Sequence, residues 1–217
     1  MALAFFDLDN TLVAGDTAQA FSEYMVASEL PTPDDFLTVN LAYMEDYDAG
    51  TLKLDDYMRY TLSPLFNLDE TQRAVFISEF IHNIVKDMAL PKAIELLEQH
   101  KKAGDELIII SATGTHLVAP IAAYLGVKYA LGVDIEYKDG FITGKLVGTP
   151  TFREGKVIRA EQWAKENGHT MEETYFYSDS HNDLPLLEKA RFPIAVDPDQ
   201  ILEKTANERN WKVISLR

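Results

Sequence analysis

Residues 3–11 read Leu3-Ala4-Phe5-Phe6-Asp7-Leu8-Asp9-Asn10-Thr11, an apolar run that ends in two carboxylates. The run predicts a strand buried on both faces, so the polar residues that follow it emerge at its carboxyl end. Side chains two positions apart point the same way along a strand, so Asp7 and Asp9 should converge on one small volume. Two anions this close repel each other unless they share a cation or a proton. A strand-ending turn rich in Asp and Asn is the plainer alternative.

Length and composition limit the possible classes of protein. The chain has 217 residues, enough for one domain with an insertion or for two small ones. Hydrophobic residues make up 47%, which allows a substantial core and argues against disorder. Acidic residues outnumber basic ones by 35 to 20, and the net charge of −15 disfavours nucleic-acid binding.

The chain contains no cysteine, which excludes disulfides, thiol nucleophiles and zinc–thiolate sites. This composition suits a cytoplasmic protein. The first apolar run is too short for a signal sequence, and no stretch approaches the length of a membrane span. We therefore expect a soluble, cytoplasmic protein without a membrane partner.

Two patterns divide the chain. From residue 17 to about residue 86, apolar residues recur at helical spacing, and no strand pattern interrupts them. Strands and helices alternate after this block. Strands are predicted at 107–110, 175–177, 193–196 and 212–214, helices at 91–103, 115–125, 155–167 and 200–208, and a hairpin at 134–146. The alternation predicts a parallel sheet covered by helices, and ligands of such sheets bind outside the carboxyl ends of the strands.

Polar residues follow two further predicted strands. Asp179 and Asp183 come after one of them, and such oxygen ligands suit Mg²⁺, which takes one or two carboxylates and keeps waters and phosphate oxygens. Asp183 could instead cap the next helix. Ser111 and Thr113 come after the other strand and precede a helix, where a hydroxyl and free N–H groups can hold a phosphate, although capping alone is an alternative.

Lys156 is predicted in the first turn of a helix, where a positive charge opposes the helix dipole. A lysine that faces the site could pair with Asp7 and with a phosphate, which would account for this position. A solvated surface lysine is the alternative.

Taken in order, these motifs resemble the haloacid dehalogenase superfamily. The pattern is Asp-x-Asp-x-Thr after the first strand, an apolar strand ending in Ser111, then Lys156, then Asp-Ser-x-x-Asp from Asp179. The hairpin with Lys138-Asp139-Gly140 is similar to the phosphoserine phosphatase branch, and residues 9–17 are similar to its bacterial histidinol-phosphatase relatives. The resemblance implies a Rossmann-like, three-layer α/β core formed by 1–13 and 88–217. It also implies an inserted all-helical cap of the first type at 14–87.

The resemblance also implies roles for individual residues. Asp7 would be the nucleophile and Asp9 the general acid and base, in a Mg²⁺-dependent phosphomonoesterase with an aspartyl-phosphate intermediate. The phosphate would be held by Ser111, Ala112, Lys156 and Asn182. The metal would be held by Asp7, Asp179 and the backbone carbonyl of Asp9, with Asp183 supporting the site. Dehalogenases of the superfamily lack the second aspartate, so dehalogenation is disfavoured.

Asp16 stands where phosphoserine phosphatases carry a glutamate that meets the substrate's ammonium group. The shorter side chain puts phosphoserine in doubt, whereas histidinol phosphate also carries an amine. Helix capping is the alternative for Asp16. Arg59 is a candidate partner for an anionic substrate group, with a solvent-facing arginine as its alternative. We therefore expect the substrate to be a small phosphorylated metabolite, an amino-alcohol or amino-acid phosphate such as histidinol phosphate, and the protein to be a monomer or homodimer.

Three other functions fit parts of the pattern. Phosphoserine phosphatase and a phosphoryl transferase or mutase of the same fold would use the same residues. A phospho-accepting signalling receiver also groups Asp, Ser or Thr, and Lys on strand ends. The Asp-x-Asp spacing and the large helical insertion argue against a receiver.

Overall fold

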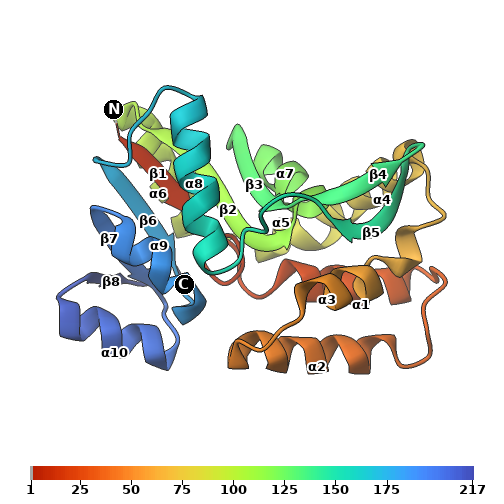
Figure 1. Cartoon of the computed structure of the whole chain (residues 1–217). Helices are drawn as coiled ribbons and strands as arrows, with labels where there is room; N and C mark the ends of the chain where they lie inside the picture. The colour runs from red at the N-terminus through yellow and green to blue at the C-terminus, as the bar shows by residue number, and fades with distance from the viewer. Residues whose placement is uncertain (1) are drawn as a thin grey trace.

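The computed structural model describes residues 2–217, and its core is a six-stranded sheet. The strands are β1 (Leu3–Phe6), β2 (Glu106–Gly114), β3 (Tyr129–Val133), β6 (Thr174–Ser178), β7 (Phe192–Val196) and β8 (Lys212–Ile214). Neighbouring strands pair in parallel in the order β3-β2-β1-β6-β7-β8 (Figure 1). The chain builds outward from β1 first on one side and then on the other, so the topological switch point lies between β1 and β6.

Helices cover both faces of the sheet. These helices are α6 (Pro91–Ala103), α7 (Thr115–Tyr124), α8 (Glu154–Glu166), α9 (Leu184–Lys189) and α10 (Gln200–Arg209). One buried cluster joins α6 and α7 to one face, and a second joins α8, α9 and α10 to the other. The predicted three-layer α/β architecture with a parallel sheet is confirmed.

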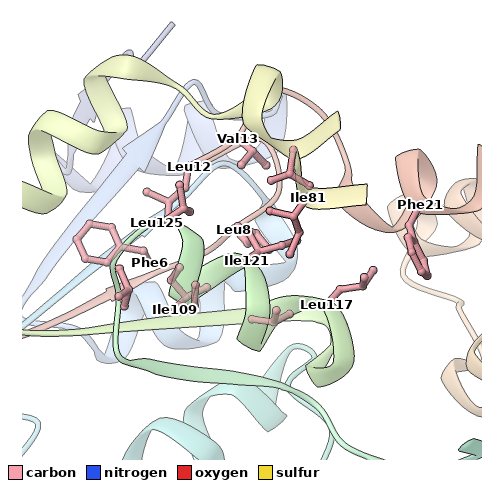
Figure 2. Close-up of a cluster of buried hydrophobic side chains, with 14 of the residues drawn as sticks. Phe6, Leu8, Leu12, Val13, Phe21, Ile81, Ile109, Leu117, Ile121 and Leu125 are labelled. Atoms are coloured by element: carbon pink, nitrogen blue, oxygen red, sulfur yellow. The ribbon is translucent and has the colours of Figure 1, made fainter. Parts of the chain in front are cut away.

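The first strand owes its place to side chains that are apolar on both faces. Ala4 and Phe6 belong to one cluster, Leu3 and Phe5 belong to the other, and all four are buried. Figure 2 shows Phe6 in the first cluster, together with Ile109 of β2. A strand with no polar face is stable only at the centre of the sheet, and β1 lies there.

A helical insertion, residues 17–88, follows β1. It contains α1 (Thr17–Ala27), α2 (Phe36–Ala49), α3 (Leu54–Thr61), the 3₁₀ turn η1 (Ser63–Leu65), α4 (Glu70–Phe80), the π-helical turn η2 (Ile81–Val85) and α5 (Lys86–Met88). As the sequence predicted, no strand lies within this described block. Since β1 and β2 are neighbours, the whole insertion is part of a single crossover.

The two ends of the insertion meet at a short neck. Val13 and Ala89 form an antiparallel bridge, and Ala14 N donates to Met88 O at 2.7 Å. The proposed division into a core (1–13 and 88–217) and a cap (14–87) places its boundaries at this neck. Met1, at the start of the first core segment, lies outside the described residues.

The predicted hairpin is present as β4 (Ile135–Lys138) and β5 (Phe141–Leu146), which pair antiparallel. It leaves the sheet after β3, and β5 lies against α3 of the insertion (Figure 1). Arg73 of α4 donates to Gly140 O at 3.2 Å and stacks over the Tyr137 ring at 4.9 Å. The hairpin therefore connects the core to α3 and α4 of the helical insertion.

The sheet is larger than the sequence indicated. The strand β3 was not predicted, and β2 continues to Gly114 rather than ending at Ile110. Gly132 interrupts the apolar run of β3, and a Cβ there would lie only 2.7 Å from Thr115 N. The strand depends on this close approach to the start of α7, which the pattern of apolar residues does not reveal.

Candidate active site

Three strand ends surround a cavity of about 260 Å³ at the switch point. The carboxyl ends of β1, β2 and β6 contribute Asp7, Ser111 and Asp179. The helical insertion closes the opposite side with residues of α1, α2 and α3. The described residues lining the cavity include five aspartates and neither lysine nor arginine. A cavity with this lining attracts cations. It can bind an anion only if a further positive charge is present.

Lys156 supplies one positive charge from behind this lining. Its side chain is 1% exposed, and its Nζ lies 2.7 Å from Asp7 Oδ1 and 2.7 Å from Asp183 Oδ2. The residue lies in the first turn of α8, as predicted. Gly155 allows this turn to approach the preceding loop, since a Cβ at this residue would lie 1.9 Å from Pro150 O. The surface alternative for Lys156 is therefore wrong.

Electrostatics set the protonation of this buried pair. Burial lowers the pKa of the Lys156 ammonium, but the Asp183 and Asp7 carboxylates outweigh it and raise that pKa above its usual value. Burial raises the pKa of the Asp7 carboxyl well above its usual range, and Asp183 and Asp179 add to the rise while Lys156 opposes it. The single ammonium does not balance the surrounding carboxylates, so the site favours a second cation.

The carboxylate of Asp9 is held from two directions. Its Oδ1 accepts from the backbone N and the Oγ1 of Thr17, both at 2.6 Å. Its Oδ2 accepts from Ser111 Oγ at 3.2 Å and from Thr113 Oγ1 at 2.8 Å. Thr17 begins the first helix of the insertion, so Asp9 joins the insertion to the end of β2. This arrangement fixes the carboxylate beside Asp7 without burying it completely.

Asp179 and Asp183 lie on one loop but have different surroundings. Thr11 Oγ1 contacts Asp179 Oδ1 at 3.3 Å, and Asp179 N donates to Thr11 Oγ1 at 3.1 Å. Burial, followed by the neighbouring Asp183 carboxylate, raises the pKa of Asp179 to about 7. Asp183 Oδ2 accepts from Ser178 Oγ and from Lys156, and its side chain does not cap α9. Helix capping, the alternative for Asp183, is therefore wrong.

The donor set is suited to a hard cation. Asp7 and Asp179 present carboxylate oxygens to the same cavity, and Asp183 Oδ1 is buried without a hydrogen-bond partner in residues 2–217. Within those residues, no three His, Cys, Asp or Glu side chains form a metal-binding group. Two carboxylates and a backbone carbonyl, completed by waters and a phosphate oxygen, are the ligands that Mg²⁺ commonly takes. The unpaired Asp183 oxygen leaves one buried acceptor that is not satisfied by the residues 2–217.

The remaining predicted residues differ in their positions. Asp16 and Ala112 line the cavity, and Asp16 also caps α1 by accepting from Gln19 N at 2.8 Å. Asn182 is buried and is not among the residues that line the cavity; its side chain is bonded to Arg153 and to the backbone oxygen of Tyr47, which does line it. Arg59 is exposed on α3 and does not line the cavity, so the structure does not bring it to the site.

Several residues at the site were not among the predicted ones. Thr17 holds Asp9, while Tyr47, Tyr57 and Asp199 line the cavity. Thr113, which was predicted with Ser111 as a phosphate-site or capping residue, lines the cavity and donates its hydroxyl to Asp9. Asp199 caps α10 and accepts from His181 N at 2.7 Å. Thr17 stands near a recognised motif, so a search for hydroxyls beside the carboxylates could have found it. The tyrosines belong to the insertion, and only the fold brings them to the strand ends.

Comparisons with known proteins agree with this geometry. A family model described as haloacid dehalogenase-like hydrolase matches residues 4–188. A histidinol-phosphatase of Neisseria meningitidis is 37% identical over 99% of both chains. A phosphoserine phosphatase of Mycobacterium tuberculosis is 32% identical over 100% of this chain and 71% of that protein. A crystal structure of a protein of unknown function from Bordetella pertussis is 35% identical, with a TM-score of 0.92, and the match covers 99% of this chain and 98% of that one.

The predicted resemblance and the prediction of a hydrolytic enzyme with phosphatase relatives are confirmed. In residues 2–217, no helix has the length and apolar character needed to cross a membrane. The family model covers most of the chain, and the histidinol-phosphatase of Neisseria meningitidis matches 99% of it. The chain belongs to the haloacid dehalogenase-like hydrolase family.

Proposed function

We propose that this hydrolase is a Mg²⁺-dependent phosphomonoesterase that acts on a small amine-bearing metabolite through an aspartyl-phosphate intermediate. One observation carries the proposal. Asp7 ends the central strand with one carboxylate oxygen bonded to the buried Lys156, and it faces a cavity that four other aspartates also line. A carboxylate in this position can attack phosphorus, while the neighbouring cation reduces the repulsion between the two anions.

The residues of the chain divide the reaction between them. Asp7 attacks the phosphorus atom and the ester oxygen leaves, which gives an acyl phosphate on Asp7. Asp9 donates a proton to the departing alkoxide and then accepts one from the water that hydrolyses the acyl phosphate. The hydrogen bonds from Thr17 and Thr113 hold Asp9 in place for both transfers. When bound, Mg²⁺ would supply positive charge that stabilises the phosphoryl oxygens.

The phosphate group requires donors around it. Ser111 contacts Asp9 through a long 3.2 Å hydrogen bond, and its hydroxyl can turn toward a phosphate oxygen. Ala112 lines the cavity just before α7 and offers its backbone N–H. The Asn182 amide carries two hydrogens, so it can donate to Tyr47 O and to a phosphate oxygen together. Lys156 would complete this set.

The remaining cavity wall supports a small substrate with an amine. Asp16 lies at the N-terminal cap of α1, and Met44, Leu52 and Leu54 provide further, apolar lining of the same cavity. The relative named histidinol-phosphatase matches over the whole chain, and histidinol phosphate carries an amine that Asp16 could bind. Phosphoserine is the second candidate, because another relative is named for that substrate. We further propose that the enzyme works in the cytoplasm as a monomer or homodimer.

The test is phosphate release from a panel of phosphorylated metabolites with Mg²⁺ or with EDTA. Asp7→Asn should abolish turnover in a folded protein, and Asp9→Asn should lower kcat by about two orders of magnitude or more. Near-normal phosphate release by Asp7→Asn would show that the mechanism is wrong. Adding an acceptor alcohol and analysing the products distinguishes this hydrolase from a phosphoryl transferase of the same fold.

Ca²⁺ should bind without supporting turnover. It accepts more oxygen ligands at longer distances than Mg²⁺ and would loosen the alignment of the attacking carboxylate. Inhibition by Ca²⁺ that excess Mg²⁺ reverses is the expected result. Full activity in excess EDTA would contradict the metal assignment.

A further inference from the structure

The end of α2 contacts the loops that carry the catalytic residues. Asn182 Nδ2 donates to Tyr47 O at 3.2 Å, and the Tyr47 ring lies 5.4 Å from the Phe152 ring. Asn182 lies on the same loop as Asp179 and Asp183, and Phe152 lies four residues before Lys156. In Figure 1, this end of α2 is the one that faces the sheet. The insertion therefore contacts the core beside the reaction centre, and not only at the neck and the hairpin.

Arg153 reinforces this contact. Its Nε donates to Asn182 Oδ1 at 3.1 Å, and its guanidinium lies so close to Gly50 that a Cβ there would be 1.8 Å from Nη2. Gly50 ends α2 in the left-handed conformation, so the cation lies where the helix dipole is negative. Arg153 has φ 51° and ψ −122°, a conformation that non-glycine residues rarely adopt outside functional sites. This strained backbone conformation occurs at the residue whose guanidinium lies against the end of α2.

The contact holds the Tyr47 side chain at the reaction centre. Tyr47 lines the cavity with Asp7 and Asp179. Burial raises the pKa of the Tyr47 phenol well above its usual value, and the Asp183, Asp7 and Asp179 carboxylates raise it further. A phenol is a neutral hydrogen-bond donor near neutral pH, and this one comes from the insertion rather than from a strand end. Because the lining is so acidic, a neutral donor can approach an anionic substrate without adding repulsion.

We propose that Tyr47 contacts the substrate, donating a hydrogen bond from its phenol to an oxygen of the phosphate ester. We further propose that Arg153, acting through Asn182 and Gly50, is the positioning residue that holds Tyr47 there. This inference rests on the proposed phosphatase function. It assigns the end of α2 two tasks, closing the cavity and completing the set of donors around the phosphate.

The first test removes only the hydroxyl. Tyr47→Phe should lower kcat/KM for p-nitrophenyl phosphate by about tenfold or more, the expected loss for one hydrogen bond to a charged group. Tyr43→Phe is the matched control, because Tyr43 lies one turn earlier on α2 and does not line the cavity. It should stay within about twofold of wild type. A Tyr47→Phe enzyme with the wild-type kcat/KM would overturn the proposal.

The second test separates positioning from stability. Arg153→Ala should lower kcat/KM to about the same extent as Tyr47→Phe, and Arg153→Lys should recover part of the loss. If Arg153 acts through Tyr47, the double variant should be little worse than either single variant, because the two effects are not additive. Two independent losses that multiply would show that Arg153 does not act through Tyr47.

Glycine substitutions provide a control for backbone strain. Gly50 and Gly104 both end helices in the left-handed conformation, with φ of 70° and 79°. An added Cβ meets the Arg153 guanidinium at Gly50 and nothing within 4 Å at Gly104. Both alanine variants should lose stability through the same strain, but only Gly50→Ala should lose kcat/KM. Equal activity of the two variants would overturn the contact as a positioning device.

These outcomes are distinct from a failure of the proposed function. If the wild-type enzyme with Mg²⁺ releases no phosphate from p-nitrophenyl phosphate or from the metabolite panel, the phosphatase proposal itself fails. If the wild-type enzyme is active and Tyr47→Phe is unchanged, only the role of Tyr47 is wrong.

Discussion

At the scale of single residues, the centre of the molecule is one ammonium shared by two carboxylates. Lys156 is fully buried and is bonded to Asp7 and Asp183, both at 2.7 Å. A buried ion pair of this kind adds little stability compared with an apolar replacement of the whole group, but the removal of one partner leaves an uncompensated charge. The arrangement is therefore better explained by catalysis than by folding.

Lys156→Met should destabilise the protein by about 3–5 kcal/mol, because Asp7 and Asp183 would remain buried without their cation. Urea unfolding measures this change. Adding Asp183→Asn to Lys156→Met should recover part of the loss, since one of the two orphaned charges is removed. An unchanged unfolding midpoint for Lys156→Met would mean that water already compensates these carboxylates.

Asp16 offers a test of substrate selectivity. Asp16→Asn keeps a good helix cap but removes the charge, whereas Asp16→Ala removes both. If Asp16 binds a substrate ammonium group, Asp16→Asn should lower kcat/KM for histidinol phosphate by about tenfold or more and leave p-nitrophenyl phosphate nearly unchanged. An equal fall in kcat/KM for both esters would mean that Asp16 serves only as the cap of α1. No wild-type activity on histidinol phosphate would leave the amine unsupported.

The sequence predicted the residues that local chemistry distinguishes. Asp7 and Asp9 end a buried strand, so spacing predicted that they converge, although it left a simple turn open. For Lys156 the helix dipole was a hint that left a surface lysine open, and the family resemblance placed it at the site. Tyr47 could not be found in this way, because the apolar spacing around it predicts a helix and distinguishes no single residue of it. Its role depends on contacts with Asn182, 135 positions further along the chain.

At the scale of elements, the contact between α1 and α7 contains an unusual group. His116 lies in the first turn of α7, its ring centroid is 6.2 Å from that of Phe21, and neither ring nitrogen has a hydrogen-bond partner among residues 2–217. Burial, together with the nearby Arg73 cation, lowers the pKa of this imidazole to about 3. The insertion and the core therefore meet over a histidine that stays neutral.

This histidine should make the protein sensitive to acid. Between about pH 6.5 and pH 3, the unfolded chain binds a proton on the imidazole and the folded chain does not, so stability falls as pH falls. At about pH 5 the loss is roughly 2 kcal/mol. In urea unfolding, the free energy of unfolding of His116→Leu should fall less between about pH 6.5 and pH 5 than that of wild type, by this amount.

His82→Leu serves as the control, because His82 is exposed on η2 of the same insertion. This variant should keep the wild-type acid dependence. Parallel curves of unfolding free energy against pH for wild type and His116→Leu would contradict the argument.

The elements also show where sequence patterns are insufficient. The helices of the insertion and the strand β1 were predicted because each carries its own periodic or continuous apolar pattern. The strand β3 was missed, because Gly132 breaks its pattern for the sake of a close approach to α7. When the residue types of a strand are determined by contacts with neighbouring elements, its own sequence pattern predicts the strand only weakly.

At the scale of the whole molecule, negative charge accumulates around the cavity. The chain has a net charge of −15, and five aspartates are among the described residues that line the cavity. Self-repulsion of this kind destabilises the folded state, as it often does where function requires a charged site. A cation bound at the cavity should therefore stabilise the entire fold as well as support catalysis.

Asp179→Asn tests this trade between stability and function. In EDTA, the variant should have a higher Tm than wild type, and its free energy of unfolding should be larger by about 1 kcal/mol or more. The reason is that a buried carboxylate, which is repelled by the neighbouring aspartates, is gone. Mg²⁺ should raise the Tm of wild type but not that of the variant, which should also release no phosphate.

Asp87→Asn is the matched control, since it removes an equal charge from an exposed position on α5. If both variants gained the same stability in EDTA, the effect would come from net charge. If Asp179→Asn were less stable than wild type in EDTA, its carboxylate would contribute to the fold without a metal, and the proposed reason for its place in the cavity would be wrong.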